Sequence, residues 1–368
     1  MKQLKIPAVF MRGGTSNAIV LHERDLPRER ALWDEVFLAA IGSPDPYGRQ
    51  LDGMGGGISS LSKVCVVGPS SRADADIDYT FAQVQVKEAK VDYSGNCGNM
   101  SSAMGPFAVD EGLVKVSGNE ALVRIHNTNT RKLILAHVPV RDGEAAVDGD
   151  FELAGVAGRG ARIALDFIEP GGAGTGRLLP TGRPCDVIAG VEASCVDATN
   201  PLVFVRARDV GLTAAETPPA VDANADVMAR LEKIRVEAAM RMGLPPSASA
   251  PKIAFVAAPT DYVALDGLRH GAGEYDVLAR AISMGNCHRA FPLTSAMCLA
   301  VAARIEGTVV HEASRPRGTR SNNIRLGHAS GVLPLDAAVA IRDGSAWAER
   351  VTVYRTARRL MEGFVRVP

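Results

Sequence analysis

Two stretches of small residues, each preceded by a polar turn, restrict the fold of this 368-residue sequence more than any other feature. One follows Asn-Cys-Gly at 96–98 and runs to Gly112, and the other follows Phe-Pro-Leu-Thr-Ser at 291–295 and runs to Gly307. Each has the pattern of a helix that is small on every side, which predicts burial all round. A strand pattern comes after each. We therefore expect two similar domains, each with a sheet wrapped around one central helix.

The remaining pattern predicts an α/β (α+β) protein. Further helices are expected at 29–41, at 222–242 with Asp222 as N-cap, and at 274–285. Pro106 implies a kink or an early end in the first central helix. The stretch 169–184 is dense in Gly and Pro and is the best candidate linker. The expected domains are 1–183, joined by a C-terminal strand at 355–368, and 184–354.

Charge and composition exclude several classes of partner. Lys plus Arg and Asp plus Glu both total 41, whereas a nucleic-acid surface needs an excess of basic residues. No segment approaches the ~18 apolar residues of a membrane span, and the apolar run at 6–11 is too short for a signal peptide. The six cysteines are scattered without zinc spacing. We expect a cytoplasmic protein with reduced cysteines, no nucleic-acid or membrane partner, and no metal or organic cofactor.

Cys97 and Lys63 are the two residues most suited to chemistry. Asn-Cys-Gly-Asn places Cys97 at the start of a helix, where free N–H groups and the helix dipole favour a thiolate. Lys63 lies between a glycine-rich loop and an apolar strand, where it could point into a cleft and act as a base. Burial of Cys97 in the core and exposure of Lys63 at the surface remain open alternatives.

Two glycine clusters, 13–14 and 53–57, could offer backbone N–H groups to carboxylates, or could be plain turns. Neither has the Gly-Lys-Ser/Thr ending of a P-loop. Single arginines and histidines near polar turns could bind an anion or serve the structure. These residues are Arg12, Arg289, Arg325, His288 and His328.

Three long strings give the sequence a family resemblance. MRGGTS at 11–16, IGSPDPYGRQLDGMGGGISSLSK at 41–63 and SGNCGNMSSAMGPFAV at 94–109 closely resemble the PrpF family. That family comprises 2-methylaconitate cis-trans isomerases and related allylic isomerases of unsaturated di- and tricarboxylates. The resemblance covers essentially the whole chain. It implies the fold of diaminopimelate epimerase, with two pseudo-symmetric domains and an active site between them, at the starts of the central helices.

The resemblance also implies the site residues. Lys63 would be the main acid/base group, and Cys97 a second acid/base group or a polarising contact. Where epimerases of this fold have a second cysteine, this chain has Thr294 and Ser295, which disfavours a two-thiol racemase. The implied substrate contacts are Ser16, Asn17, Met54, Gly55, Gly56, Asn96, Gly98, Asn99, Ser283, Met284, His288, Arg289, Thr294 and Ser295.

The expected substrate is an unsaturated tricarboxylate such as 2-methylaconitate. Many members have a basic residue where this chain has Asn17, so 4-oxalomesaconate, methylitaconate and aconitate remain alternatives. A non-enzymatic alternative is an accessory binding protein for an aconitase-like iron–sulfur dehydratase. A homodimer is compatible with this expectation.

Overall fold

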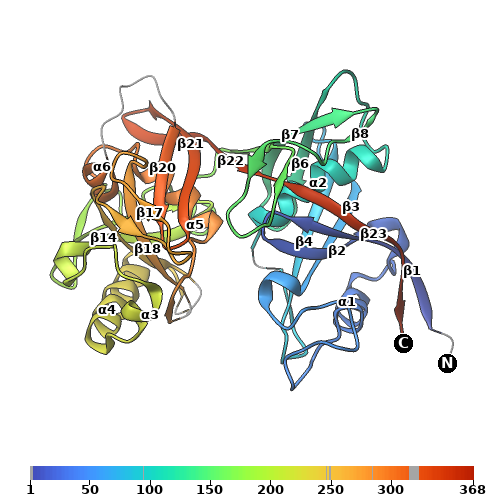
Figure 1. Ribbon diagram of the computed structural model, residues 1–368, viewed down its shortest axis with the longest axis horizontal. Helices are drawn as coiled ribbons and strands as arrows, with labels where there is room; N and C mark the ends of the chain where they lie inside the picture. Colours follow the sequence, from blue (N-terminus) through green and yellow to red (C-terminus); the bar gives the residue numbers. More distant parts are fainter. Residues whose placement is uncertain (1–2, 94, 246, 248–249, 284, 315–322) are drawn as a thin grey trace. The chain divides into compact units, whose positions relative to one another are not determined.

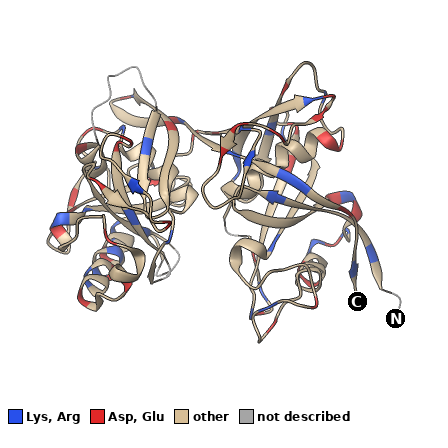
Figure 2. Cartoon of the chain, in the orientation of Figure 1, with Lys and Arg blue, Asp and Glu red and all other residues tan. Residues whose placement is uncertain are grey.

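The fold is taken from a computed structural model that describes residues 3–93, 95–245, 247, 250–283, 285–314 and 323–368. The chain forms two compact units, Met1–Asp166 with Tyr354–Pro368, and Phe167–Val353. Sheets dominate both units and a few helices pack on them (Figure 1), as the α/β prediction requires. Lys, Arg, Asp and Glu are interspersed over both (Figure 2). The domain limits at 183 and 354 stay a prediction.

The first unit is a mixed sheet in the order β23-β1-β2-β3-β4-β6-β7. Its helix α2 (Gly98–Asp110) contacts strands from both ends of that order, so the sheet curls around the helix. The other elements are α1 (Trp33–Ile41), β1 (Leu4–Gly13), β2 (Ser16–His22), β3 (Lys63–Pro69), β4 (Ile77–Val84), β5 (Val91–Asp92), β6 (Glu120–Asn127), β7 (Lys132–Arg141), β8 (Glu144–Ala145), β9 (Phe151–Glu152), β10 (Arg159–Gly160), β11 (Ile163–Ile168) and β23 (Ala357–Val367).

The second unit is a mixed sheet in the order β12-β13-β14-β15-β18-β20-β21-β22. Helix α5 (Leu293–Ala302) is buried against β13, β14 and β21. The other elements are α3 (Pro218–Asp222), α4 (Ala225–Arg241), α6 (Val309–Ala313), β12 (Asp186–Ile188), β13 (Val191–Ala198), β14 (Asn200–Arg206), β15 (Lys252–Ala257), β16 (Tyr262–Val263), β17 (Arg269–His270), β18 (Val277–Ser283), β19 (Asn286–Cys287), β20 (Asn323–His328), β21 (Gly331–Arg342) and β22 (Ser345–Arg355).

The two sheets follow the same pattern of strand pairing. From β1 to β7 the pairs are antiparallel, parallel, antiparallel, parallel and antiparallel. From β13 to β21 the succession is identical. Each central helix follows the fourth strand of its series and precedes the fifth. The internal similarity predicted from the two small-residue helices is therefore confirmed.

Two local predictions were wrong. The segment 274–285 was expected to be a helix, but it contains β18, which is buried on both faces between β15 and β20 and so lacks the alternation of a half-buried strand. Helix α4 is capped by the side chain of Asn224 rather than by Asp222. Helix α2 continues through Pro106 and ends at Asp110, short of the expected Gly112, and packing on every side holds the turn that lacks one N–H; the kink at Pro106 stays a prediction.

The stretch 169–184, expected as a linker, is a folded loop of the second unit. It wraps around the buried carboxylate of Asp197, whose Oδ2 accepts from the N–H groups of Gly174 and Thr175 at 2.8 and 2.7 Å. A buried carboxylate requires such donors, and a glycine-rich loop can approach it closely. Among the described residues, no helix is long and apolar enough to cross a lipid bilayer.

Candidate active site

Lys63 begins β3 and is buried, with 7% of its surface exposed. Its Nζ donates to Oε1 of Gln83, its partner across the β3–β4 ladder, at 2.5 Å, and lies 5.0 Å from the ring centroid of Phe81. The Gln83 amide is itself fixed, since Nε2 donates to the carbonyls of Ser62 and Ser59 at 2.9 and 3.0 Å. The lysine therefore meets a neutral amide and an aromatic ring inside the first unit. The alternative of an exposed surface lysine is wrong, and its place in a substrate cleft stays a prediction.

Cys97 is the N-cap of α2, with an extended backbone (φ −105°, ψ 101°). Its carbonyl accepts the first helical hydrogen bond, from the N–H of Ser101 at 2.9 Å. Its half-buried thiol makes no capping bond. The N–H groups of Gly98, Asn99 and Met100 precede that first bond and have no acceptor within the helix. Their partial positive charge favours an anion, whether thiolate or substrate, at this point.

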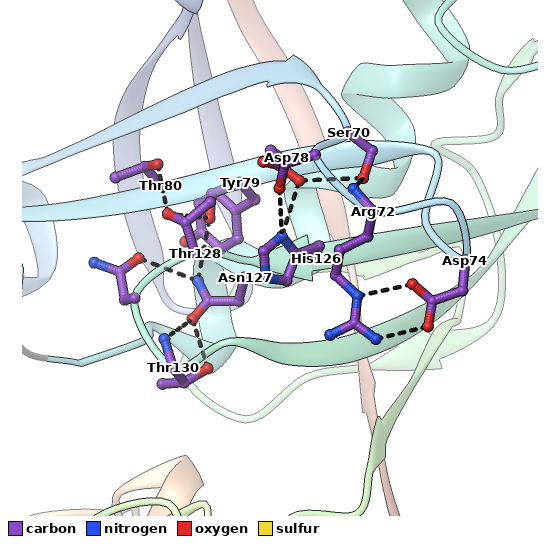
Figure 3. Close-up of polar contacts among 12 residues, drawn as sticks. Ser70, Arg72, Asp74, Asp78, Tyr79, Thr80, His126, Asn127, Thr128 and Thr130 are labelled. Carbon is purple, nitrogen blue, oxygen red and sulfur yellow. Dashed lines mark hydrogen bonds and ion pairs between the residues drawn. The ribbon is translucent and has the colours of Figure 1, made fainter.

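The polar turn before α2 is held by β4 and β6. Asn96 exchanges hydrogen bonds with Ser101 Oγ at 3.1–3.2 Å and accepts from Asn127 Nδ2 at 3.4 Å. Asn127 is fully buried and also accepts from the N–H and hydroxyl of Thr130. Figure 3 shows the part of this network around Asn127 and Thr130, together with two neighbouring contacts: His126 Nδ1 to the carboxylate of Asp78 at 2.9 Å and the Thr80–Thr128 hydroxyl pair. These bonds fix the residue that precedes Cys97.

Cys65 connects the two candidate catalytic residues. Lys63 and Cys65 are two positions apart on β3, so their side chains lie on the same face of the sheet. Burial raises the pKa of the Cys65 thiol; the nearby Cys97 raises it further, and Lys63 acts in the opposite direction. Both residues are thus close enough to Cys65 to act on it electrostatically. Cys65 itself is fully buried and neutral, and it is not a nucleophile.

The Gly13-Gly14 turn packs directly on the first turn of α2. A Cβ on Gly13 would lie 2.7 Å from the carbonyl oxygen of Asn99, and one on Gly14 would overlap the Asn99 amide. Gly14 also has a positive φ of +52°. Ser16 is buried at the start of β2, and Asn17 is half-buried opposite Arg12. This turn is therefore fitted against the candidate site, although the backbone N–H of Gly14 bonds to Thr356.

The loop 53–57 does not offer a row of free N–H groups. Those of Met54 and Gly55 bond to the carbonyls of Ala40 and Ile41 at 2.9 and 3.0 Å, and that of Gly57 bonds to Gln50 Oε1 at 2.8 Å. These three N–H groups are therefore already bonded within the protein, and Gly53 and Gly55 pack closely on Ile41 at the end of α1. The role of Met54 and Gly55 as substrate contacts stays a prediction. Gly56 is exposed and stays a predicted contact.

The second-unit residues lie on the segment from β18 to the start of α5. Ser283 ends β18, His288 and Arg289 are exposed, and Met284 lies outside the described residues. Thr294 is half-buried and its carbonyl accepts from Thr199 at 2.9 Å. Ser295 is fully buried, and within the described residues its hydroxyl has no hydrogen-bond partner. Their role as substrate contacts stays a prediction.

The other candidate cations serve the structure. Arg12 donates to the carbonyls of Gly14 and Thr356, and Arg325 pairs with the buried Asp276. His328 is buried and accepts from the N–H of Ser330. Each of these three side chains thus has a structural partner, and their binding of a substrate carboxylate stays a prediction. Within the described residues, no cluster of three His, Cys, Asp or Glu side chains is arranged for a metal ion.

Two functional candidates were missed by the sequence analysis. Gln83 is visible only once the β3–β4 register sets it opposite Lys63. Arg355, at the end of β22, is buried and donates to Asn99 Oδ1 at 3.1 Å. The only sequence signal for it was its place at the start of the C-terminal strand assigned to the first domain. A surface cavity of about 650 Å³ lies elsewhere in this unit, lined by residues such as Tyr47, Asp52 and Arg366, and contains no predicted site residue.

Comparison with known proteins finds relatives that match essentially the whole chain. The chain is 43% identical to 3-methylitaconate isomerase of Eubacterium barkeri, covering 99% of this chain and 98% of that protein. It is 40% identical to 2-methyl-aconitate isomerase of Cupriavidus necator, covering 100% and 98%. The crystal structure of a methylitaconate-delta-isomerase superposes with a TM-score of 0.90 at 42% identity, covering 100% of this chain and 96% of the other.

The fold extends to more distant proteins. A probable proline racemase from Agrobacterium radiobacter K84 superposes with a TM-score of 0.53 at 12% identity, covering 99% of this chain and 93% of the other, which shows the shared fold alone. The model of the family described as PrpF protein matches residues 3–368. This chain therefore belongs to the PrpF family.

Proposed function

We propose that the protein is a cofactor-independent isomerase that moves an allylic proton on an unsaturated di- or tricarboxylate. The observation that carries this proposal is the presence, within one unit, of a buried lysine and of a cysteine at a helix N-terminus, both of which influence the pKa of the Cys65 thiol. A base and a second proton carrier are what such a reaction needs. The relatives named as isomerases act on acids of this class.

In the proposed mechanism, Lys63 Nζ in its amine form removes a proton from the carbon next to the C=C–COO⁻ unit. The electron pair of the broken C–H bond moves into the conjugated system and gives a dienolate. Return of a proton to the same carbon after rotation gives cis-trans isomerisation, and return two atoms away shifts the double bond. Cys97 is the second acid/base group, and Gln83 orients the Lys63 ammonium formed in the first step.

The developing negative charge requires fixed donors that are already in place. The N–H groups of Gly98, Asn99 and Met100 at the start of α2 fit this need. Ser101 and Asn96 hold the turn that presents them. We assign these N–H groups to the dienolate or to the carboxylate that conjugates with it.

We take 2-methylaconitate as the lead substrate and 3-methylitaconate as the second candidate, which the 43% and 42% identities to methylitaconate isomerases favour. 4-Oxalomesaconate is a third, since a further relative, at 38% identity, is named 4-oxalomesaconate tautomerase. All three present a carboxylate conjugated with a double bond or able to become so. We also propose a cytoplasmic location, which suits the six free cysteines.

The test is a panel of purified acids, each incubated with the enzyme and followed by ¹H NMR. Conversion of one acid into its isomer, at a rate proportional to enzyme concentration, is the expected result. If none of the acids is converted, the isomerase proposal is wrong and the accessory binding role for an aconitase-like dehydratase is favoured. If either isomer as starting material gives the same equilibrium mixture, the reaction is also reversible.

A further inference from the structure

A buried arginine without an acidic partner lies at the start of α2. Arg355 ends β22 and is 6% exposed. Its Nε donates to Oδ1 of Asn99 at 3.1 Å, and Nη1 donates to the carbonyl of Tyr354 at 2.8 Å. Both acceptors are neutral. Within the described part of the chain, Arg355 forms no ion pair and Nη2 has no acceptor.

The position of this side chain is fixed by its neighbours. The carbonyl of Thr356 accepts from the N–H of Gly14 and from Arg12, both at 2.9 Å, so the segment after β22 is tied to the glycine turn. Arg355 Cδ lies 3.1 Å from the point that a Cβ on Gly14 would occupy. Asn99, which receives the guanidinium, is two residues after Cys97. The guanidinium is therefore held at the N-terminal turn of α2.

Burial of this cation is unfavourable unless an anion compensates it. Burial lowers the pKa of Arg355 to about 10, while the proximity of Cys97 acts in the opposite direction. The guanidinium is thus still charged near neutral pH. The guanidinium and the N-terminus of α2 are thus two sources of positive potential at one place. Within the described residues, no carboxylate is paired with either of them.

We propose that Arg355 binds a carboxylate of the substrate through its Nη2 edge, next to the N–H groups of the first turn of α2. A guanidinium suits this task because it offers parallel N–H donors to the two oxygens of a carboxylate. Asn99 is a positioning residue here, since Oδ1 receives Arg355 and Nδ2 donates to Thr15 Oγ1 at 3.0 Å. The identity of the substrate rests on the proposed function, but the anion site does not.

The test uses propane-1,2,3-tricarboxylate, which has no double bond to move and so reports binding alone. Calorimetric titration of the full-length protein is compared with Arg355→Met and with Arg358→Met, a matched control at an exposed arginine three residues away. Loss of a hydrogen-bonded charge pair weakens binding by about tenfold to a hundredfold. We expect that loss in Arg355→Met and wild-type affinity in Arg358→Met. Equal affinity of Arg355→Met and wild type, or no binding by wild type, overturns the proposal.

Asn99→Asp tests the same site without removing the arginine. The substitution places a carboxylate 3.1 Å from Nε and so gives Arg355 the partner it lacks. We expect this variant to fold with wild-type thermal stability or better and to bind the tricarboxylate at least about tenfold more weakly. Affinity equal to wild type contradicts the proposal even if Arg355→Met does not fold. Tight binding through Arg355 in a protein that isomerises no acid would support this site and contradict the proposed function.

Discussion

The two units share a sheet pattern but differ at the start of the central helix. Helix α2 begins with an extended cysteine, a buried arginine donates to Asn99 in its first turn, and a buried lysine lies two positions from Cys65 on β3. Helix α5 begins with Pro292 and Leu293 and has only the hydroxyls of Thr294 and Ser295 in its first turn. The difference teaches that a repeated strand pattern does not repeat the side chains around its helix. Under the proposed mechanism, proton transfer belongs to the first unit.

The largest effect is expected at Lys63. Lys63→Met keeps most of the aliphatic packing and removes the base, so turnover should fall by about 10³-fold or more. Lys115→Met, at an exposed lysine of the same unit, is the control and should keep wild-type turnover. Initial rates with the preferred acid measure both. Wild-type turnover in a folded Lys63→Met would show that Lys63 is not the base.

Cys97→Ala should lower turnover by about 10²-fold, because a second acid/base group typically contributes 10²–10⁴-fold. Cys185→Ala is the matched control, since Cys185 is also a half-buried free cysteine but lies in the second unit. Rates at saturating substrate separate the two. A larger loss of turnover in Cys185→Ala than in Cys97→Ala would contradict the assignment of the second acid/base group to the first unit.

Gly14→Ala tests the fit of the glycine turn against α2. Gly14 and Gly112 both have positive φ, +52° and +64°, but a Cβ on Gly112 has nothing within 4 Å. Each substitution should cost about 1 kcal/mol for its backbone conformation. Gly14→Ala should cost about 1–3 kcal/mol more through overpacking on Asn99, and should also lower turnover. Denaturant unfolding measures the loss of stability in Gly14→Ala and in Gly112→Ala. Equal losses in the two variants would show that the Gly13-Gly14 turn is not tightly fitted against α2.

The smallest effect distinguishes two helix hydroxyls. Ser102 Oγ donates to the carbonyl of Asn99 at 2.6 Å, whereas Ser295 Oγ has no partner in the described residues. Ser102→Ala should lower the free energy of unfolding by about 1 kcal/mol. Ser295→Ala should leave it unchanged or raise it, because it removes an unsatisfied buried group. A greater loss in Ser295→Ala would mean that this hydroxyl is bonded in the ligand-free protein.

The features that the sequence predicted have local physical causes, whereas those that it did not predict depend on contacts between distant segments or on burial. The place of Cys97 followed from local signals, a polar turn and a helix that is small on every side. The strand at 277–283 was missed because a strand buried on both faces has no alternation to detect. The loop 53–57 carried no sign that the N–H groups of Met54 and Gly55 bond to the end of α1. Gln83 and Arg355 depend on pairing between distant segments, which a single sequence does not reveal.

The most direct measurement of the central claim is solvent exchange. Wild type, Lys63→Ala and Cys97→Ala are incubated in D₂O with the acid that the panel identifies, and deuterium at the allylic carbon is followed by NMR. Our account predicts rapid incorporation by wild type, none above background by Lys63→Ala, and slow incorporation by Cys97→Ala. Incorporation by a folded Lys63→Ala at the wild-type rate would contradict it.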